Sequence, residues 1–195
     1  MPFDYDSIAP RYERSIAPFE RWFLTNLRRE AIAAMPASGC ILELGAGTGL
    51  NFVHYNRATR VVATEPSTEM IRIAASKATP VVLAQSCAEQ LPFKDRSFDG
   101  ALATLVMCSV KSPEQVFSEL QRVVRPGGTI SLVEHVRPEG ALGPLFDLLN
   151  QISIRLADDH FNRRTAMLAE SAGLKVIKRR KVGLGIINVI SCEVV

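Results

Sequence analysis

The chain has 195 residues, of which 47% are hydrophobic and 22% charged, and its formal net charge is +3. These values are ordinary for a folded globular protein, so they exclude a disordered or collagen-like chain. The length suits one compact domain that buries a substantial core. A charge excess this small gives little attraction to phosphates, so we expect no nucleic-acid partner.

The spacing of the cysteines and the composition of the N-terminus indicate whether to expect a metal site and which cellular compartment to expect. No C-x-x-C pair occurs, so we expect neither a zinc site nor a disulfide framework, and a reducing compartment follows. The N-terminus carries Asp4 and Asp6 instead of an apolar stretch, so no signal peptide is expected. No uncharged run, Gly100–Val110 among them, approaches the ~20 residues that a membrane-spanning helix needs. We expect a cytoplasmic protein and leave a peripheral membrane contact open.

Short β-rich segments alternate with helical ones along the chain. The first five predicted strands are apolar almost throughout, which is typical of parallel strands covered on both faces. The predicted strands are Cys40–Gly45, Arg60–Glu65, Val81–Gln85, Phe98–Leu105, Thr129–Val136, Leu174–Val182 and Ile187–Val195.

The predicted helices fall between these strands. Ser67 and Ser112 stand where N-caps belong, each with an acidic residue in the first turn. The predicted helices are Phe19–Met35, Leu50–Tyr55, Ser67–Ala78, Pro113–Val124, Leu142–Leu156 and Arg164–Ala172. The last two strands are separated only by Gly183–Ile186, too short a connection for parallel strands. We therefore predict a Rossmann-like, doubly wound α/β sheet of seven strands, mostly parallel, with an antiparallel C-terminal hairpin.

A glycine-rich turn, Gly45–Gly49, follows the first predicted strand directly. Glycines let the backbone bend sharply and approach a ligand closely. The dinucleotide fingerprint would need glycine at position 50, which is Leu50, and no P-loop lysine follows. Glu43, just before the turn, suits a cationic ligand better than a pyrophosphate. This pattern indicates S-adenosylmethionine, which has an ammonium, a sulfonium and no phosphate.

Glu65 ends the second predicted strand, 20 residues after Gly45. An acidic residue at this spacing reaches ribose hydroxyls in doubly wound folds. The alternative for Glu65 alone is a solvated loop carboxylate. Its connection to the glycine turn through one short helix favours the ribose role.

Five motifs together resemble the class I methyltransferases, and most of all the group with the ubiquinone and menaquinone biosynthesis enzymes. They occur in the family's order: Glu43–Gly49, Glu65–Ser67, Ala88–Phe93, Ser97–Asp99 and Arg125–Gly128. The resemblance implies S-adenosyl-L-methionine as cofactor and S-adenosyl-L-homocysteine as product. It covers residues 40 to 136 and does not identify a substrate.

The resemblance also implies roles for single residues. Gly45, Gly47 and Gly49 would line the methionine half of the cofactor, Glu65 would bind the ribose diol, and Met70 would pack near the adenine. Where the family has aspartate before the Ala-Glu pair, this chain has Cys87, so adenine recognition rests on backbone near Ala88 and packing, or on Ser86. Thr104 and Leu105 should border the transferable methyl group, because ligands bind beyond the carboxyl ends of such strands.

The segment Tyr5–Glu13 resembles the Y-D-x-x-A-x-x-Y-D lid of the same group. Tyr5 and Tyr12 would then close over the site, and a ring facing a sulfonium gains about 0.5–2 kcal/mol of cation–π attraction. The alternative is an N-terminal turn packed on the surface. We expect one methyltransferase domain over 1–195, with a lid and helix (1–35), a cofactor-binding core (36–136) and a substrate-side insertion and hairpin (137–195).

The acceptor side carries a narrower resemblance. Ala103–Pro113 and Glu134–Val136 are similar to the alkyl thiol methyltransferases of animals, whereas phospholipid N-methyltransferases and quinone-ring methyltransferases share most of the scaffold. His135, at the carboxyl end of a strand, could act as general base, or it is a structural histidine. Asp158 belongs to a polar cluster with Asp159 and His160 that could contact substrate; the alternative is an exposed helix end.

These observations predict an S-adenosylmethionine-dependent methyltransferase for a small or amphiphilic acceptor. A thiol is favoured, followed by a phospholipid amine or a quinone ring. The expected partner is a small-molecule or lipid-like substrate, and the oligomeric state stays open. The alternatives are a nicotinamide-dependent dehydrogenase and a non-catalytic S-adenosylmethionine-binding module on the same fold.

Overall fold

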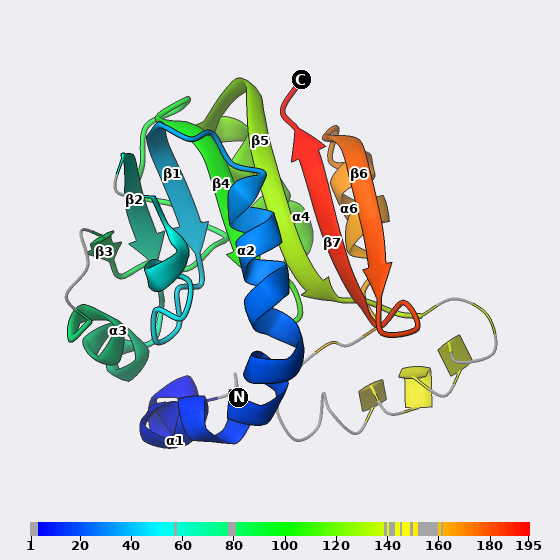
Figure 1. Cartoon of the computed structure of the whole chain (residues 1–195). Helices are drawn as coiled ribbons and strands as arrows, with labels where there is room; N and C mark the ends of the chain where they lie inside the picture. The colour runs from blue at the N-terminus through cyan, green and yellow to red at the C-terminus, as the bar shows by residue number, and fades with distance from the viewer. Residues whose placement is uncertain are drawn as a thin grey trace.

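The computed structural model describes residues 4–56, 58–77, 81–138, 140, 143–144, 146–148, 150–151, 160 and 162–195. Its strands form one seven-stranded sheet in the order β3-β2-β1-β4-β5-β7-β6 (Figure 1). The strands are β1 Gly39–Leu44, β2 Thr59–Thr64, β3 Val81–Ala84, β4 Phe98–Thr104, β5 Val124–His135, β6 Lys175–Val182 and β7 Ile187–Glu193.

The strand pairing confirms the predicted sheet. β1 to β5 pair in parallel, whereas β7 lies between β5 and β6 and is antiparallel to both. Leu44 is in register with Thr64 of β2 and Ala103 of β4. The segments that follow β1, β2 and β4 therefore emerge side by side at one edge of the sheet, where ligands of such folds bind.

The helices cover both faces of the sheet. In Figure 1, α2 crosses the near face, while α4 and α6 lie behind the sheet and α1 lies with α3 below its carboxyl edge. Residues 143–144, 146–148 and 150–151 are also helical. The helices are α1 Tyr5–Phe19, the π-helix η1 Glu20–Leu24, α2 Thr25–Ala33, the 3₁₀ helix η2 Phe52–His54, α3 Thr68–Ala75, α4 Pro113–Val123 and α6 Thr165–Ser171.

Two predicted helices differ from the structure. The helix expected over Leu50–Tyr55 is only η2, because residues 48–51 continue the glycine turn. The single helix expected over Phe19–Met35 is η1 followed by α2, and α1 precedes it. α1 contains Pro10 and Pro18, which donate no N–H, and such irregularities commonly follow prolines.

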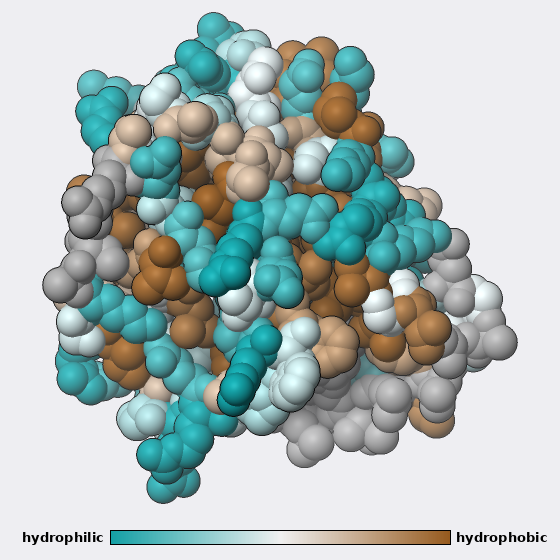
Figure 2. Space-filling model, viewed as in Figure 1, coloured by the Kyte–Doolittle hydropathy of each residue, from teal (hydrophilic) through white to brown (hydrophobic). Residues whose placement is uncertain are grey.

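The buried core lies on both faces of the sheet. Leu24 and Leu27, from η1 and α2, pack with Val133 of β5 on one face. Phe117 and Leu120 of α4 belong to the larger cluster on the other face. Figure 2 shows hydrophilic side chains over α2 and hydrophobic surface on either side of it. Among the described residues, no helix has the length and apolar character to cross a bilayer.

Candidate active site

The glycine turn after β1 adopts a backbone that other residues rarely adopt. Gly45 and Gly47 have φ values of +59° and +54°. A Cβ at Gly45 would lie 2.6 Å from Cγ2 of Val106, whereas one at Gly47 would meet no atom within 4 Å. The chain thus packs tightly under Gly45 and leaves open space over Gly47. A ligand can approach the Gly47 backbone there, which fits the methionine end of S-adenosylmethionine.

Glu65, directly after β2, is only 6% exposed and faces this turn. Its Oε2 accepts a hydrogen bond from the Gly47 amide at 2.8 Å, and its Oε1 accepts one from the Ser67 amide at 2.9 Å. Burial raises the pKa of this carboxyl. A carboxylate can accept about four hydrogen bonds, so both oxygens keep room for ribose hydroxyls. Glu65 therefore fits the predicted ribose role and also holds the turn in place.

Glu43 lies fully buried beneath the turn. Its Oε1 accepts from Nδ2 of Asn51 at 2.9 Å and its Oε2 from the Tyr55 hydroxyl at 2.8 Å. Burial raises the pKa of Glu43 to about 7. Both carboxylate oxygens are thus bonded to protein donors, so Glu43 supports the turn from inside. Contact with a cationic ligand stays a prediction.

Asn51 extends this network in two directions. Its Nδ2 also lies 3.2 Å from Oγ1 of Thr104, at the end of β4, and its Oδ1 accepts from Arg28 at 3.0 Å. Arg28 in turn forms a buried ion pair with Glu20 at 2.9 Å. The network ties the N-terminal helices to the ends of β1 and β4.

Sequence reasoning missed Asn51, Tyr55 and Arg28. The sequence did contain an indication of Asn51 and Tyr55. A buried acidic residue before the turn needs hydrogen-bond donors, and these two donors lie four residues apart just after the turn.

The residues expected near the adenine lie on α3 and in the segment after β3. Met70 and Ala88 are buried, whereas Cys87 is exposed. The Ser86 hydroxyl lies 3.0 Å from the carbonyl of Cys87 and 2.9 Å from that of Gln90. The Ser86 hydroxyl therefore donates its hydrogen to carbonyl groups of its own loop. If Ser86 contacts the adenine, its hydroxyl oxygen would act as the acceptor. The adenine roles of Met70, Cys87 and Ala88 stay predictions.

The loop after β4 is held firmly against β5. Leu105 has φ +58°, a strained value for a non-glycine residue, and its amide donates to Val133 at 2.8 Å. The amides of Val106 and Met107 both donate to Oε1 of the buried Glu134, at 3.0 and 3.2 Å. Strained residues cluster at functional sites, and the predicted position of Thr104 and Leu105 beside the methyl group stays a prediction. Glu134 was noticed only through resemblance.

Helix α1 carries the two tyrosines of the expected lid, whose closure over a ligand stays a prediction. The Tyr5 hydroxyl is 2.7 Å from Oγ of Ser109 in the loop after β4. Burial raises the pKa of Tyr12, and the positive charge of Arg28 lowers it by a smaller amount. At the other end of the edge, the Asp6 carboxylate accepts from the Glu69 amide at 2.9 Å. α1 therefore bridges α3 and the β4 loop across the glycine-turn edge.

The remaining acceptor-side predictions have mixed outcomes. His135 is half-buried at the end of β5, with its ring centroid 5.9 Å from that of Phe19. Asp158 and Asp159 lie outside the described residues. The amide of His160 donates to the Cys108 carbonyl at 3.0 Å, so the chain returns there to the β4 loop. In the described part of the chain, no His, Cys, Asp or Glu side chains gather as metal ligands would.

Known proteins share this arrangement. A family model described as a methyltransferase domain matches residues 42–132. Over 111 residues the chain is 36% identical to a mouse thiol S-methyltransferase, and over 122 residues it is 37% identical to the phosphatidylethanolamine N-methyltransferase of Cereibacter sphaeroides. The chain therefore carries a class I S-adenosylmethionine-dependent methyltransferase domain.

The matches cover only part of each relative. They span 52% of this chain and 45% of the mouse protein, and 59% of this chain and 60% of the bacterial protein. A demethylmenaquinone methyltransferase of Renibacterium salmoninarum is 27% identical over 83% of this chain and 69% of its own length. Its relatives therefore act on different acceptors, and they leave the acceptor of this chain undetermined.

Solved structures agree on the fold. A chain in the complex between the Trm112 methyltransferase activator of Haloferax volcanii and a methyltransferase superposes with a TM-score of 0.80. It shares 15% identity, over 100% of this chain and 99% of its own. A Thermotoga maritima methyltransferase gives 0.70 at 27% identity, over 94% of this chain and 98% of its own. S-adenosylmethionine is the methyl donor of this family.

Proposed function

We propose that this protein transfers a methyl group from S-adenosylmethionine to a small or amphiphilic acceptor. The observation that carries the proposal is the open space over Gly47, bordered by the buried Glu65 carboxylate. When bound, S-adenosylmethionine supplies an electrophilic methyl group on a sulfonium and leaves as S-adenosylhomocysteine. Positioning can supply most of the catalysis of such a transfer.

The chain offers a set of groups that would hold this cofactor. The Gly45–Gly49 backbone would line its methionine part, Glu65 would accept from the ribose hydroxyls, and Met70 would pack near the adenine. Thr104 and Leu105, where β4 ends, would border the methyl group. Tyr5 and Tyr12, on the bridging helix α1, would exclude water from the reacting atoms.

We favour a thiol as acceptor, followed by a phospholipid amine or a quinone ring. Relatives named as thiol, phosphatidylethanolamine and demethylmenaquinone methyltransferases support this range. The ring of Phe19 lies beside that of His135, the candidate base, and Trp22 and Phe23 are exposed on the neighbouring η1. An aromatic rim of this kind suits burial of an apolar acceptor.

His135 is the candidate general base. With a thiol acceptor, the imidazole of His135 would accept the thiol proton, and the sulfur would take the methyl group that S-adenosylmethionine would supply. Asp158 stays a candidate for contacting the same acceptor. A proton acceptor of this kind commonly contributes at least ~10²-fold to the rate.

The first test is cofactor binding. Isothermal titration should give saturable binding of S-adenosylhomocysteine and none of NADH. NADH binding with no S-adenosylhomocysteine binding would instead support a nicotinamide-dependent dehydrogenase.

The second test is a methyl-transfer screen over alkyl thiols, phosphatidylethanolamine vesicles and quinols. On the acceptor that responds, His135→Ala should lower turnover on the order of 10²-fold with S-adenosylhomocysteine affinity intact. His54→Ala, a half-buried histidine on η2, is the matched control and should keep wild-type turnover. A drop of less than about threefold for His135→Ala would contradict the base role. Cofactor binding without turnover on any acceptor would support a non-catalytic module.

A further inference from the structure

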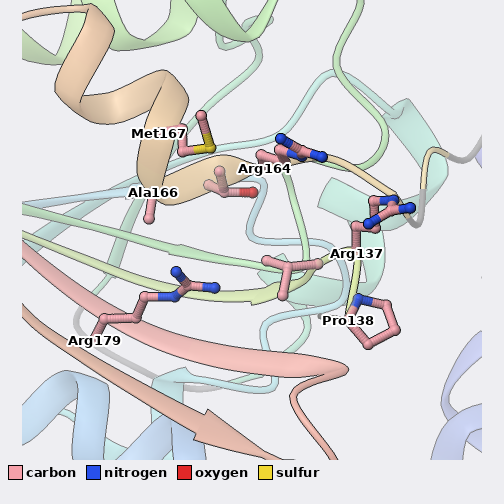
Figure 3. Close-up of a pocket in the computed structure, with 8 residues that line it drawn as sticks. Arg137, Pro138, Arg164, Ala166, Met167 and Arg179 are labelled. Carbon is pink, nitrogen blue, oxygen red and sulfur yellow. The ribbon is translucent and has the colours of Figure 1, made fainter. Parts of the chain in front are cut away.

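Apart from the candidate active site, a pocket lies on the α6 side of the sheet, beyond the carboxyl end of β5. Its volume is about 210 Å³. Three arginines line it, from three separate segments: Arg137 after β5, Arg164 before α6 and Arg179 on β6. Figure 3 shows Arg137 and Arg164 together on one side of this pocket and Arg179 reaching in from another. No motif of the methyltransferase family accounts for this concentration of positive charge.

Arg137 and Arg179 are oriented by hydrogen bonds to their neighbours, and Arg137 and Arg164 keep donors that no described residue uses. Asp147 accepts from Nε and Nη2 of Arg137 at 2.9 and 2.8 Å, which leaves Nη1 without an acceptor among the described residues. Nε of Arg179 donates to Oδ1 of the buried Asn188 at 3.1 Å. The guanidinium of Arg164 has no hydrogen bond or ion pair to any residue that the structure describes. Asp147 thus compensates Arg137, whereas the charge of Arg164 is compensated by no ion pair to a described residue.

Thr165 supplies an independent observation. It lines the same pocket and is only 1% exposed, yet its hydroxyl has no hydrogen-bond partner within the described structure. A buried hydroxyl without a partner costs about 1–3 kcal/mol. Such groups are rare in folded proteins, and a bound ion or water is one kind of partner that completes them.

We propose that this pocket, the arginine pocket, binds a phosphate group. Guanidinium groups match phosphate oxygens in geometry and charge, and donors from three segments with one hydroxyl suit a tetrahedral anion better than a planar carboxylate. The pocket is smaller than the roughly 300–1,000 Å³ typical of sites for whole drug-sized ligands. It therefore holds one phosphate or phosphodiester group and not a nucleotide. The ligand is either a soluble phosphate compound or the head group of a phospholipid.

The test uses inorganic phosphate as probe, by isothermal titration at constant ionic strength, with acetate as the planar control. Wild type should bind phosphate saturably and more tightly than acetate. Arg164→Gln and Arg179→Gln should each weaken phosphate binding at least ~10-fold. Arg60→Gln, an exposed arginine on β2 that does not line the pocket, should leave it unchanged.

Thr165→Val separates a ligand role from a structural one. It keeps the shape and removes the hydroxyl, so phosphate binding should fall several-fold while the thermal midpoint holds or rises. Unchanged phosphate affinity in the Arg164→Gln/Arg179→Gln double variant would overturn the proposal, as would wild-type binding no tighter than that of acetate.

The source of the phosphate is decided by flotation with vesicles of phosphatidylethanolamine and phosphatidylglycerol. Vesicle binding that inorganic phosphate displaces, and that the double variant loses, identifies a lipid head group. Phosphate binding without vesicle binding identifies a soluble ligand. S-adenosylhomocysteine affinity, measured on the same variants, should not change. The test of the phosphate site is therefore independent of the test of methyl transfer.

Discussion

The glycine turn and the arginine pocket lie along the same edge of the sheet and use their polar groups in opposite ways. Around the turn, Glu65 binds two backbone amides, and Asn51 joins Glu43 to Thr104. In the arginine pocket, Arg164 has no partner in the described structure and the Thr165 hydroxyl is buried without one. The first region is preorganised by its own contacts, whereas the second is completed only by a ligand.

The difference has a physical origin. A cofactor shared by a whole family binds mainly to backbone, so its site needs a rigid turn supported from beneath. An anion binds to long side chains whose charges have to remain available. The two regions should therefore respond independently to substitution.

The largest expected effect is on the open space over Gly47. Gly47→Val should lower S-adenosylhomocysteine affinity at least ~100-fold, because the side chain fills ligand space and meets no protein atom within 4 Å at Cβ. Gly127→Val is the matched control, since Gly127 also has positive φ (+76°) and open space at Cβ. Both variants should lose about 1–2 kcal/mol of folding stability from backbone strain.

Phosphate binding in the arginine pocket should be the same in both variants as in wild type. If Gly47→Val and Gly127→Val bind S-adenosylhomocysteine equally well, the cofactor does not lie over Gly47. A parallel loss of phosphate binding in Gly47→Val would break the independence of the two regions.

The next effect concerns pH and the buried Glu43. Its pKa of about 7 in the folded state lies above its usual value of 4.5, because burial disfavours the charged form. Between these values the folded state holds more protons than the unfolded state, so this group lowers stability as pH rises from about 4.5 to about 7. The total is on the order of 3 kcal/mol, with no further change above pH 7.

Glu43→Gln should remove this pH dependence. The measurement is the free energy of unfolding by urea, compared between the variant and wild type from pH 4.5 to pH 8. Glu114→Gln, on the exposed first turn of α4, serves as control and should keep the wild-type profile. A Glu43→Gln profile parallel to that of wild type would show that Glu43 is ionised throughout.

The sheet could be predicted because its signals are local. Apolar runs of strand length, capped helices and a four-residue connection before β7 specify parallel strands and a terminal hairpin. The positions of the glycine turn and of Glu65 follow from strand ends and spacing in the same way, because Leu44 and Thr64, which precede them, are paired in the sheet.

The side-chain network could not be predicted, because it joins distant positions. Arg28 meets Asn51 across 23 residues, and Tyr5 meets Ser109 across 104. The sequence gives no period or spacing for such contacts. The arginine pocket was missed for the same reason: Arg137, Arg164 and Arg179 are far apart in the sequence, and only the fold brings them to one pocket.

A smaller effect is expected at Glu65. Glu65→Ala should weaken S-adenosylhomocysteine binding by about 1–3 kcal/mol, because ribose hydroxyls lose an acceptor and the Gly47 amide loses its partner. Cys87→Asp is the companion, since the family's aspartate stands at that position, and it should bind the ligand as well as wild type or better. Full affinity in a folded Glu65→Ala variant would overturn the ribose role, and a large loss in Cys87→Asp would show that the adenine lies elsewhere.

The smallest effect tests whether helix α1 acts as a lid through its bond to the loop after β4. Tyr5→Phe removes the hydroxyl that lies 2.7 Å from Oγ of Ser109, and Ser109→Ala removes the other partner. Each variant should lower S-adenosylhomocysteine affinity by about 0.5–1.5 kcal/mol, the usual net value of one hydrogen bond. Because both break the same bond, the double variant should lose little more than either single one, and the cycle should give a coupling energy of that size. Additive losses would mean that Tyr5 and Ser109 act separately, and unchanged affinity in all three variants would mean that closure of α1 does not depend on this contact.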